Sequence, residues 1–439
     1  MGEKKASDFR YNTGETKVPW AAVGENYNSD DVMAFIKFLM VGEGAEYDEA
    51  VAKVEEGIKA LDKVSEAPAK LSLDKEVTKA EQMTDEYLHT TGSTFLTNCT
   101  AGFEIAGKWA GLKAGDEVIV PAITFIATMA YPLSIGCKLV FADVDPKTLN
   151  MDPADVARKI TPNTKAIYPV HMGGYPVDMD PIMELAKEHD ITVIEDAAHG
   201  FGGWYKGKAL GTIGDFGAYS FHEVKNITSF GEGGILCTNH PDFIGDMKRC
   251  RFLCTDFSQH IDKWLYDVTP ATGKGGHKFM GNNFSTTEIQ GLGLQRQLMR
   301  IDDIIAKRRA AAEYLNERLS VCDALTVQDL GNDDIKPTFH LYCLQIDPDK
   351  AGGQDVQVLK AKLAQKGVTE IAHFGPLYRY EIIRDFGFDA DEIAKTCPNC
   401  EEVFYKRYTH FPLYGLSQEQ LEYMADAILE SVQEMKEGR

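Results

Sequence analysis

Between residues 94 and 238, short apolar runs alternate with segments of helical spacing. The runs have the length and composition of buried strands, and they are 94–96, 116–121, 138–142, 165–170, 192–195, 218–221 and 235–238. Strands that alternate with helices are typical of βαβ units, which build a mostly parallel sheet with helices on both faces. The sequence therefore predicts an α/β fold. Ligands of such sheets bind beyond the carboxyl ends of the strands.

One lysine lies in the loop between the last two predicted strands. Lys225 follows the strand residues 218–221, and the chain then turns through Gly231-Glu-Gly-Gly234 into the next strand. A lysine on a loop between buried strands can be partly desolvated, which lowers its pKa and frees its amine to attack a carbonyl carbon. A surface lysine on a glycine-rich turn fits this stretch equally well.

Other polar and aromatic residues follow the strands at the same predicted edge. Asp196 ends a strand, where it either keeps a pyridine nitrogen protonated or caps the next helix. Residues 97–102 join a strand to a helix, where N–H groups bind phosphate or form an ordinary cap. Phe125 and His199 either stack on a flat cofactor or fill the core, and Ser220 is a further candidate phosphate donor.

Composition excludes several kinds of partner. The chain has 439 residues and a formal net charge of −21, which argues against nucleic acid or an anionic membrane as the main partner. Nine cysteines over this length favour reduced thiols and a cytoplasmic protein. Cys397-Pro-Asn-Cys400 lacks a second pair with zinc spacing, so we expect no metal site. No run is long enough for a membrane helix.

The remaining chain divides into a helical beginning and a smaller second domain. Residues 1–93 are read as an N-terminal helical segment, with an unusually long block at about 45–80 that Pro68 divides. A large domain is expected over 94–300. A continuous helical pattern spans 285–319. An α+β domain over 301–439 then follows, with a strand at 339–346, a helix at 356–365 and a last helix that a Ser417–Gln420 capping box begins.

The ordered set of motifs is more specific than any single motif. The set comprises Asn98-Cys-Thr-Ala101, Pro121-x-x-Thr-Phe125, Val193–His199, Ser220-Phe-His-Glu-Val-Lys-Asn226, Gly231–Gly234, Gly281-Asn-Asn283 and His373-Phe-Gly-Pro-Leu-Tyr378. Together these motifs resemble those of the DegT/DnrJ/EryC1/StrS sugar aminotransferases. The resemblance implies an aspartate aminotransferase-like (type I) fold and the cofactor pyridoxal 5′-phosphate (PLP). It is strongest to the branch that aminates C4 of nucleotide-linked 4-keto-hexoses or 4-keto-pentoses.

The resemblance also implies roles for individual residues. Lys225 would bind PLP as a Schiff base and move protons, and Asp196 would pair with the pyridine nitrogen. Phe125 and His199 would enclose the ring, and Thr100, the Ala101 backbone and Ser220 would hold the phosphate. Asn283 would reach the cofactor of a second subunit, which implies a homodimer. Those expected near the sugar are Tyr175, His222, Glu223, His373 and Tyr378.

Three features depart from the family pattern. Cys99 replaces the usual glycine, Ser285 replaces a common arginine, and the 45–80 block is longer than expected. The reaction implied is amino transfer from glutamate or glutamine to a keto-sugar. An aminotransferase for a non-nucleotide ketone, such as a keto-cyclitol, is an open alternative. A sugar dehydratase of the same family would have histidine at Lys225, and a dinucleotide-dependent dehydrogenase would need a G-x-G-x-x-G motif that the chain lacks.

Overall fold

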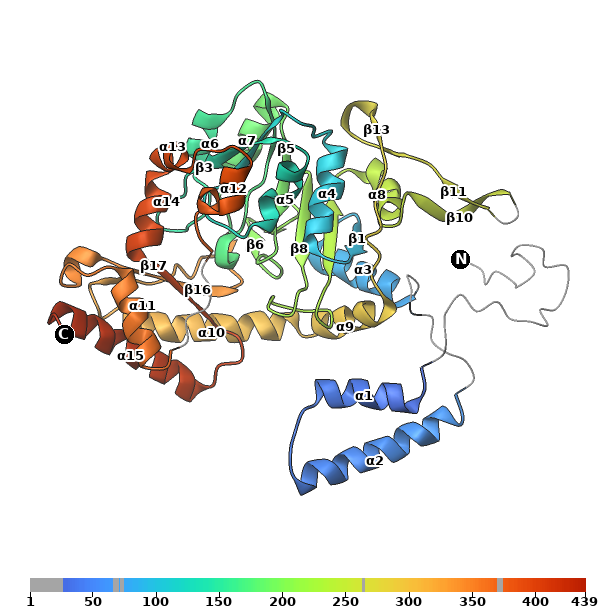
Figure 1. Ribbon diagram of the computed structural model, residues 1–439, viewed down its shortest axis with the longest axis horizontal. Helices are drawn as coiled ribbons and strands as arrows, with labels where there is room; N and C mark the ends of the chain where they lie inside the picture. The colour runs from blue at the N-terminus through green and yellow to red at the C-terminus, as the bar shows by residue number, and fades with distance from the viewer. Residues whose placement is uncertain (1–26, 66–70, 72–74, 263–264, 369–373) are drawn as a thin grey trace.

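A seven-stranded sheet forms the centre of the computed structural model, which describes residues 27–65, 71, 75–262, 265–368 and 374–439 (Figure 1). The strands lie in the order β1-β9-β8-β5-β4-β2-β3. β8, β5, β4, β2 and β3 are parallel, whereas β9 is antiparallel to both of its neighbours. Their bounds are β1 Ser93–Leu96, β2 Glu117–Pro121, β3 Lys138–Ala142, β4 Thr164–Ile167, β5 Thr192–Asp196, β8 Phe216–Ser220 and β9 Gly234–Thr238. The predicted α/β class and mostly parallel sheet are confirmed.

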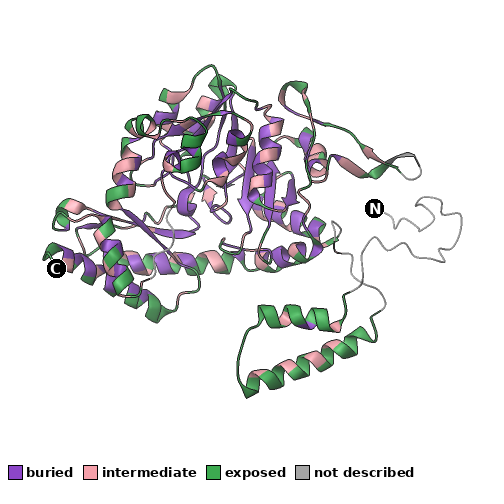
Figure 2. Ribbon diagram, in the orientation of Figure 1, coloured by how far each residue is buried: buried purple, intermediate pink, exposed green. Residues whose placement is uncertain are grey.

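Helices connect the strands and pack on the sheet. They are α4 (Cys99–Trp109), α5 (Ala127–Ser134), α6 (Pro153–Lys159), α7 (Met179–His189) and α8 (Ile244–Cys250). α4 begins at Cys99, inside the 97–102 connection, because the Asn98 side chain accepts the N–H of Ala101 and caps the helix. The sheet residues are almost all buried, and the sheet forms the purple centre of Figure 2.

A second core lies in the C-terminal part of the chain. It contains α10 (Ile301–Leu319), α11 (Val356–Gln365) and α15 (Gln418–Lys436), which pack around β14 (Leu325–Thr326), β16 (Leu341–Ile346) and β17 (Tyr408–Pro412). The Ser417–Gln420 capping box of the last helix is as predicted, and α15 buries Leu421, Met424, Ile428 and Val432. The single helix predicted over 285–319 is wrong. It is divided into α9 (Glu288–Leu298) and α10, since Arg300 has φ −122° and ψ 6°, outside the helical region.

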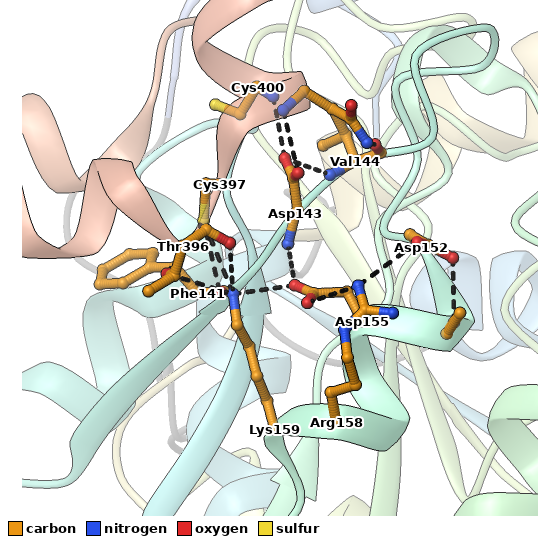
Figure 3. A network of polar contacts seen from close by, with 12 residues as sticks. Phe141, Asp143, Val144, Asp152, Asp155, Arg158, Lys159, Thr396, Cys397 and Cys400 are labelled. Carbon is orange, nitrogen blue, oxygen red and sulfur yellow. Dashed lines mark hydrogen bonds and ion pairs between the residues drawn. The ribbon is translucent and has the colours of Figure 1, made fainter.

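One segment late in the chain packs with the large sheet instead. Leu377, Tyr378, Cys400 and Val403 belong to the same apolar core as β2, β3 and α4. Asp143, just after β3, accepts the N–H groups of Asn399 and Cys400 at 3.0 and 2.8 Å (Figure 3). This segment contains α12 (Glu381–Asp385), α13 (Ala390–Lys395) and α14 (Pro398–Glu402).

Lys159 adds a cationic contact to the same junction. Its Nζ donates to the carbonyl oxygen of Phe141 at 2.6 Å and to that of Thr396 at 3.1 Å, and it pairs with Asp155 at 2.8 Å. Figure 3 shows these groups converging between the large domain and the helices that follow Leu377. The junction is therefore held by polar contacts as well as by apolar packing.

The N-terminal helices differ from the rest of the chain. α1 (Ser29–Leu39) and α2 (Ala45–Asp62) pack on each other and project from the body of the protein (Figure 1), and α3 (Lys75–Leu88) packs on α9. α2 buries none of its residues and α1 buries Met33 alone, so both are mainly green in Figure 2. α2 lies within the 45–80 block, and Pro68 lies outside the described residues.

Short strands complete the fold at its margins. They are β6 (Trp204–Tyr205), β7 (Lys208–Ala209) and β15 (Ile335–Lys336) in one sheet, β10 (Thr255–Asp262) with β11 (Leu265–Val268), and β12 (Ala271–Thr272) with β13 (Lys278–Phe279).

Candidate active site

A cavity of about 490 Å³ lies beyond the carboxyl ends of β5 and β8. Its size is within the usual range for small-molecule and cofactor sites. The predicted residues among its lining are Thr100, Phe125, Asp196, His199, Ser220, His222 and Lys225. The structure therefore brings together residues that are separated by as many as 125 positions in the chain, as the strand-end argument anticipated.

Lys225 is half-buried on the β8–β9 loop and lines the cavity. Its backbone N–H donates to the carbonyl oxygen of His222 at 2.9 Å, which fixes the local turn. Burial lowers the pKa of the Lys225 amine, although the nearby Asp196 carboxylate partly opposes that shift. A lowered pKa increases the neutral, nucleophilic fraction of the amine.

Asp196 is buried at the last position of β5. Its Oδ2 accepts the hydroxyl of Thr128 at 2.7 Å, and its Oδ1 accepts the N–H of Ala198 at 3.1 Å. Burial raises the pKa of this carboxyl, and the two hydrogen bonds limit the rise. A buried carboxylate of this kind is stabilised by a cationic partner.

The start of α4 forms one end of the cavity. Asn98, Cys99 and Thr100 line it, and the first N–H groups of a helix have no partner within the helix. Gly234 allows the β9 backbone to approach this helix start, since a Cβ there would lie 2.3 Å from the carbonyl carbon of Asn98. This arrangement can accept an anion at a helix N-terminus. The Cys99 thiol is buried, and burial raises its pKa well above the usual value.

Aromatic rings enclose the other end of the cavity. Phe125 is 52% exposed, His199 is buried, and both line the space. Phe374 contacts both rings, with its centroid 6.1 Å from that of Phe125 and 5.3 Å from that of His199. Burial lowers the pKa of His199 well below the usual value, so the ring is neutral. Its Nδ1 is buried and has no hydrogen-bond partner among the described residues.

Several predicted residues lie elsewhere. The Tyr175 hydroxyl donates to Asp329 at 3.0 Å, in a separate groove lined by α6 and α7. Tyr378 packs on Phe141 in the large core and donates to Glu401 at 2.7 Å. Neither tyrosine lines the cavity, so the predicted grouping of both with the sugar-facing residues is not reproduced within this chain.

The remaining predicted residues have mixed positions. Glu223 and Asn283 are exposed and outside the cavity lining, and His373 lies outside the described residues. The Ala101 N–H, expected to hold phosphate, already donates to Asn98 Oδ1 at 2.9 Å. Asn283 Oδ1 accepts the N–H of Ser285 at 3.3 Å.

Three residues of the site were not singled out from the sequence. Phe374 is adjacent to His373 in a motif that was recognised, but the position that lines the cavity was missed. Thr128 binds Asp196, and Glu232 lines the cavity with its carboxylate 3.7 Å from His222 Nε2. Glu232 could have been found, because it is the single charged residue of the glycine-rich turn.

The Cys397-x-x-Cys400 motif is part of the core. Both cysteines are buried, and all nine cysteines of the chain are free thiols. Among the described residues, no group of three or more histidine, cysteine or acidic side chains is arranged to hold a metal ion. A search of the same residues finds no helix that is both long and apolar enough to span a membrane.

The geometry defines an α/β protein with the fold of type I PLP-dependent transferases. The profile of the DegT/DnrJ/EryC1/StrS aminotransferase family matches residues 52–429. The chain belongs to this family, and it is a PLP-dependent aminotransferase.

Individual relatives cover most of the chain. The spore coat polysaccharide biosynthesis protein SpsC of Bacillus subtilis is 31% identical over 82% of this chain and 90% of its own length. GDP-perosamine synthase of Caulobacter vibrioides is 31% identical over 74% of this chain and 83% of its own length. Among solved structures, an aminotransferase from Psychrobacter cryohalolentis has a TM-score of 0.75 at 26% identity, covering 90% of this chain and 98% of that one.

The residues of the cavity fit PLP. The buried Asp196 carboxylate suits a protonated ring nitrogen, and the start of α4 suits a phosphate. The unpaired Nδ1 of His199 is an orphaned polar atom that a bound group can satisfy. Lys225 supplies an amine with a lowered pKa in the same cavity.

Proposed function

We propose that this protein transfers an amino group from glutamate or glutamine to the keto carbon of a sugar. The preferred substrate is a nucleotide-linked 4-keto-hexose or 4-keto-pentose. The observation that carries the proposal is the presence of Lys225 and Asp196 in one cavity, with burial acting on both groups. The motif order and the GDP-perosamine synthase relative support the choice of a keto-sugar.

The proposed residue roles follow from charge and position. PLP supplies an aldehyde and an electron-withdrawing ring to the transferred amine. Lys225 holds the cofactor through its amine and moves a proton to and from the reacting carbon. Asp196 keeps the ring nitrogen protonated, and Thr128 orients that carboxylate. Thr100 and Ser220 bind the phosphate, while Phe125 and His199 hold the ring.

The sugar-facing side is proposed to include His222, Glu232 and Phe374. All three line the cavity, and His222 and Glu232 offer polar groups for hydroxyl recognition. His373, which precedes Phe374, is retained as a sugar-facing residue from the family resemblance. A keto-cyclitol or another non-nucleotide ketone presents similar hydroxyls, so a substrate panel must include both classes.

We also propose that the active enzyme is a homodimer. Asn283 is exposed on the single chain, as expected of a residue that reaches a second subunit. Val224, which lines the cavity, and Phe230, on the same β8–β9 loop, are 61% and 49% exposed, and the proposed second subunit would cover them. Light scattering after size exclusion tests the dimer, and a monomer that remains fully active contradicts it.

The absorbance spectrum of the purified protein tests the proposed chemistry. With PLP added, the wild type is expected to show a band at ~400–430 nm that borohydride fixes to the protein. Lys225→Ala should lose the borohydride-stable link. The matched control is Lys187→Ala, on the exposed end of α7, which should behave as the wild type.

Addition of the two substrates then tests the direction of transfer. Glutamate or glutamine should bleach the band, and an accepted keto-sugar should restore it. The absence of the band with excess PLP contradicts the cofactor roles proposed for these residues. A band that no nucleotide-linked keto-sugar restores, but a keto-cyclitol does, contradicts the preferred substrate alone.

A further inference from the structure

The face of His199 is supported by a second histidine from the small domain. The ring centroids of His199 and His340 lie 4.3 Å apart, and the ring planes differ by 17°, which is a stacked arrangement. Both side chains are buried. His340 immediately precedes β16, so it comes from a different domain than His199, which follows β5. The two rings bring the domains into contact beside the cavity.

Asn226 fixes the orientation of His340. Its Nδ2 donates to the carbonyl oxygens of His199 at 3.2 Å and of Phe201 at 3.1 Å, which uses both amide hydrogens. Its Oδ1, which can only accept, lies 2.9 Å from His340 Nδ1. His340 must therefore donate from Nδ1, and the neutral ring carries its proton there.

The backbone of His199 is held by the same group of contacts. Its carbonyl oxygen accepts the hydroxyl of Thr338 at 2.7 Å in addition to the Asn226 amide. Burial lowers the pKa of both imidazoles well below the usual value. Two neutral rings can stack without charge repulsion, so the pair is a rigid and uncharged wall of the site.

We infer that His340 is a positioning residue. It sets the plane of the His199 ring, and thereby the position of the cofactor ring. The stack supplies the wall, and Asn226, adjacent to Lys225, holds the supporting ring in place. The small domain thus contributes to the cofactor site without touching the cofactor. This inference rests on the proposed contact between His199 and the PLP ring.

Three substitutions at His340 separate the stack from the hydrogen bond. The energy of a stacked aromatic pair corresponds to about three- to tenfold in affinity. This is the upper bound for His340→Ala, because an unsupported His199 ring must be ordered when PLP binds. His340→Ala should therefore raise the dissociation constant of PLP by up to that factor, and should alter the visible circular dichroism of the bound cofactor. His340→Phe keeps a ring and should restore affinity to within about twofold of the wild type. His340→Gln keeps a donor without a ring and should resemble alanine.

The outcomes show whether His340 positions the cofactor site or only stabilises the fold. Unchanged affinity and dichroism in His340→Ala overturn the inference, as does rescue by glutamine but not by phenylalanine. If the alanine variant does not fold, the comparison of phenylalanine with glutamine still decides. A wild type that shows no PLP band instead refutes the proposed function, so the two failures are distinguishable.

A second histidine in close contact with an aromatic ring provides the control. His240 packs on Trp109 with centroids 4.3 Å apart and ring planes tilted by 32°, and it is outside the cavity lining. His240→Ala should lower the melting temperature and leave the PLP dissociation constant and dichroism unchanged. An equal loss of PLP affinity in His240→Ala would show that any lost stack has this effect, and would overturn the specific role of His340.

Discussion

The crevice at the end of β5 and the α1–α2 hairpin each contain a lysine close to a carboxylate. The pKa shifts of these groups have opposite signs in the two regions. In the crevice, burial lowers the pKa of Lys225 and raises that of Asp196. On α2, the hydrogen-bonded pair raises the pKa of Lys59 and lowers that of Glu55. Loss of water dominates in the first region, and the partner charge dominates in the second. The comparison shows that position on the fold, rather than residue type, makes a lysine reactive.

We expect the largest loss of stability from substitution of Glu195, the buried neighbour of Asp196. Its carboxylate accepts the N–H groups of Gly211, Ile213 and Gly214 at 2.6–2.8 Å and pairs with His171 Nε2 at 2.9 Å. His171 Nδ1 accepts the N–H of Val177, so Nε2 carries the proton. Glu195→Gln places an amide group against these donors and should cost about 3–5 kcal/mol of unfolding free energy, measured in urea.

An exposed glutamate is the control for that substitution. Glu188, exposed on α7, should tolerate glutamine without a change in the urea midpoint. A small loss of unfolding free energy in Glu195→Gln would contradict the comparison. It would mean that a deeply buried carboxylate contributes no more to stability than an exposed one.

The next largest effect is a loss of catalytic rate on substitution of Asp196. Asp196→Asn removes the charge that is proposed to hold the ring nitrogen protonated, and should lower kcat about 100-fold or more. Steady-state kinetics measure the loss. Asp190→Asn is a suitable control, since Asp190 is exposed and has φ 53°, a conformation that asparagine accepts. Full activity of Asp196→Asn would remove Asp196 from the proposed site.

A smaller effect with a defined pH dependence is expected at Lys225. Its folded-state pKa lies below the unfolded value of 10.5, so the half-buried ammonium destabilises the cofactor-free protein at neutral pH. That penalty decreases as pH rises through the folded-state pKa toward 10.5. Lys225→Met should therefore melt a few degrees above cofactor-free wild type at neutral pH, and the difference should narrow at alkaline pH. A difference that widens with pH would contradict the sign of the shift.

The smallest effect is expected on α2. Lys59 Nζ pairs with Glu55 at 2.6 Å, with both side chains substantially exposed. Lys59→Met should change the melting temperature by roughly one degree or less, because exposed ion pairs contribute little. Lys59→Met should lower the melting temperature, whereas Lys225→Met should raise it. The folded-state pKa of Lys59 is raised, so its ion pair stabilises the folded protein, and this stabilisation is lost as pH rises. A large loss would show that this exposed pair stabilises the fold as a buried one does, and would contradict the comparison.

The sequence predicted the parts of the site that local pattern determines. Thr100, Asp196, Ser220 and Lys225 follow strands or begin helices, so the strand periodicity alone placed them at one edge. Phe374 and His340 depend on how the small domain packs against the large one, which no local pattern records. The break between α9 and α10 has no glycine or proline signal, so an uninterrupted helix was the natural prediction.

The return of the segment 377–403 to the large core has a consequence for folding during synthesis. The side chains of Leu377, Tyr378 and Val403 complete an apolar core whose other members begin near Leu96. Because chains are made from the N-terminus and domains generally fold as units, this core stays open until Val403 has left the ribosome. Nearly the whole chain of 439 residues must therefore be synthesised before either domain can close, so a nascent chain exposes apolar surface throughout that time.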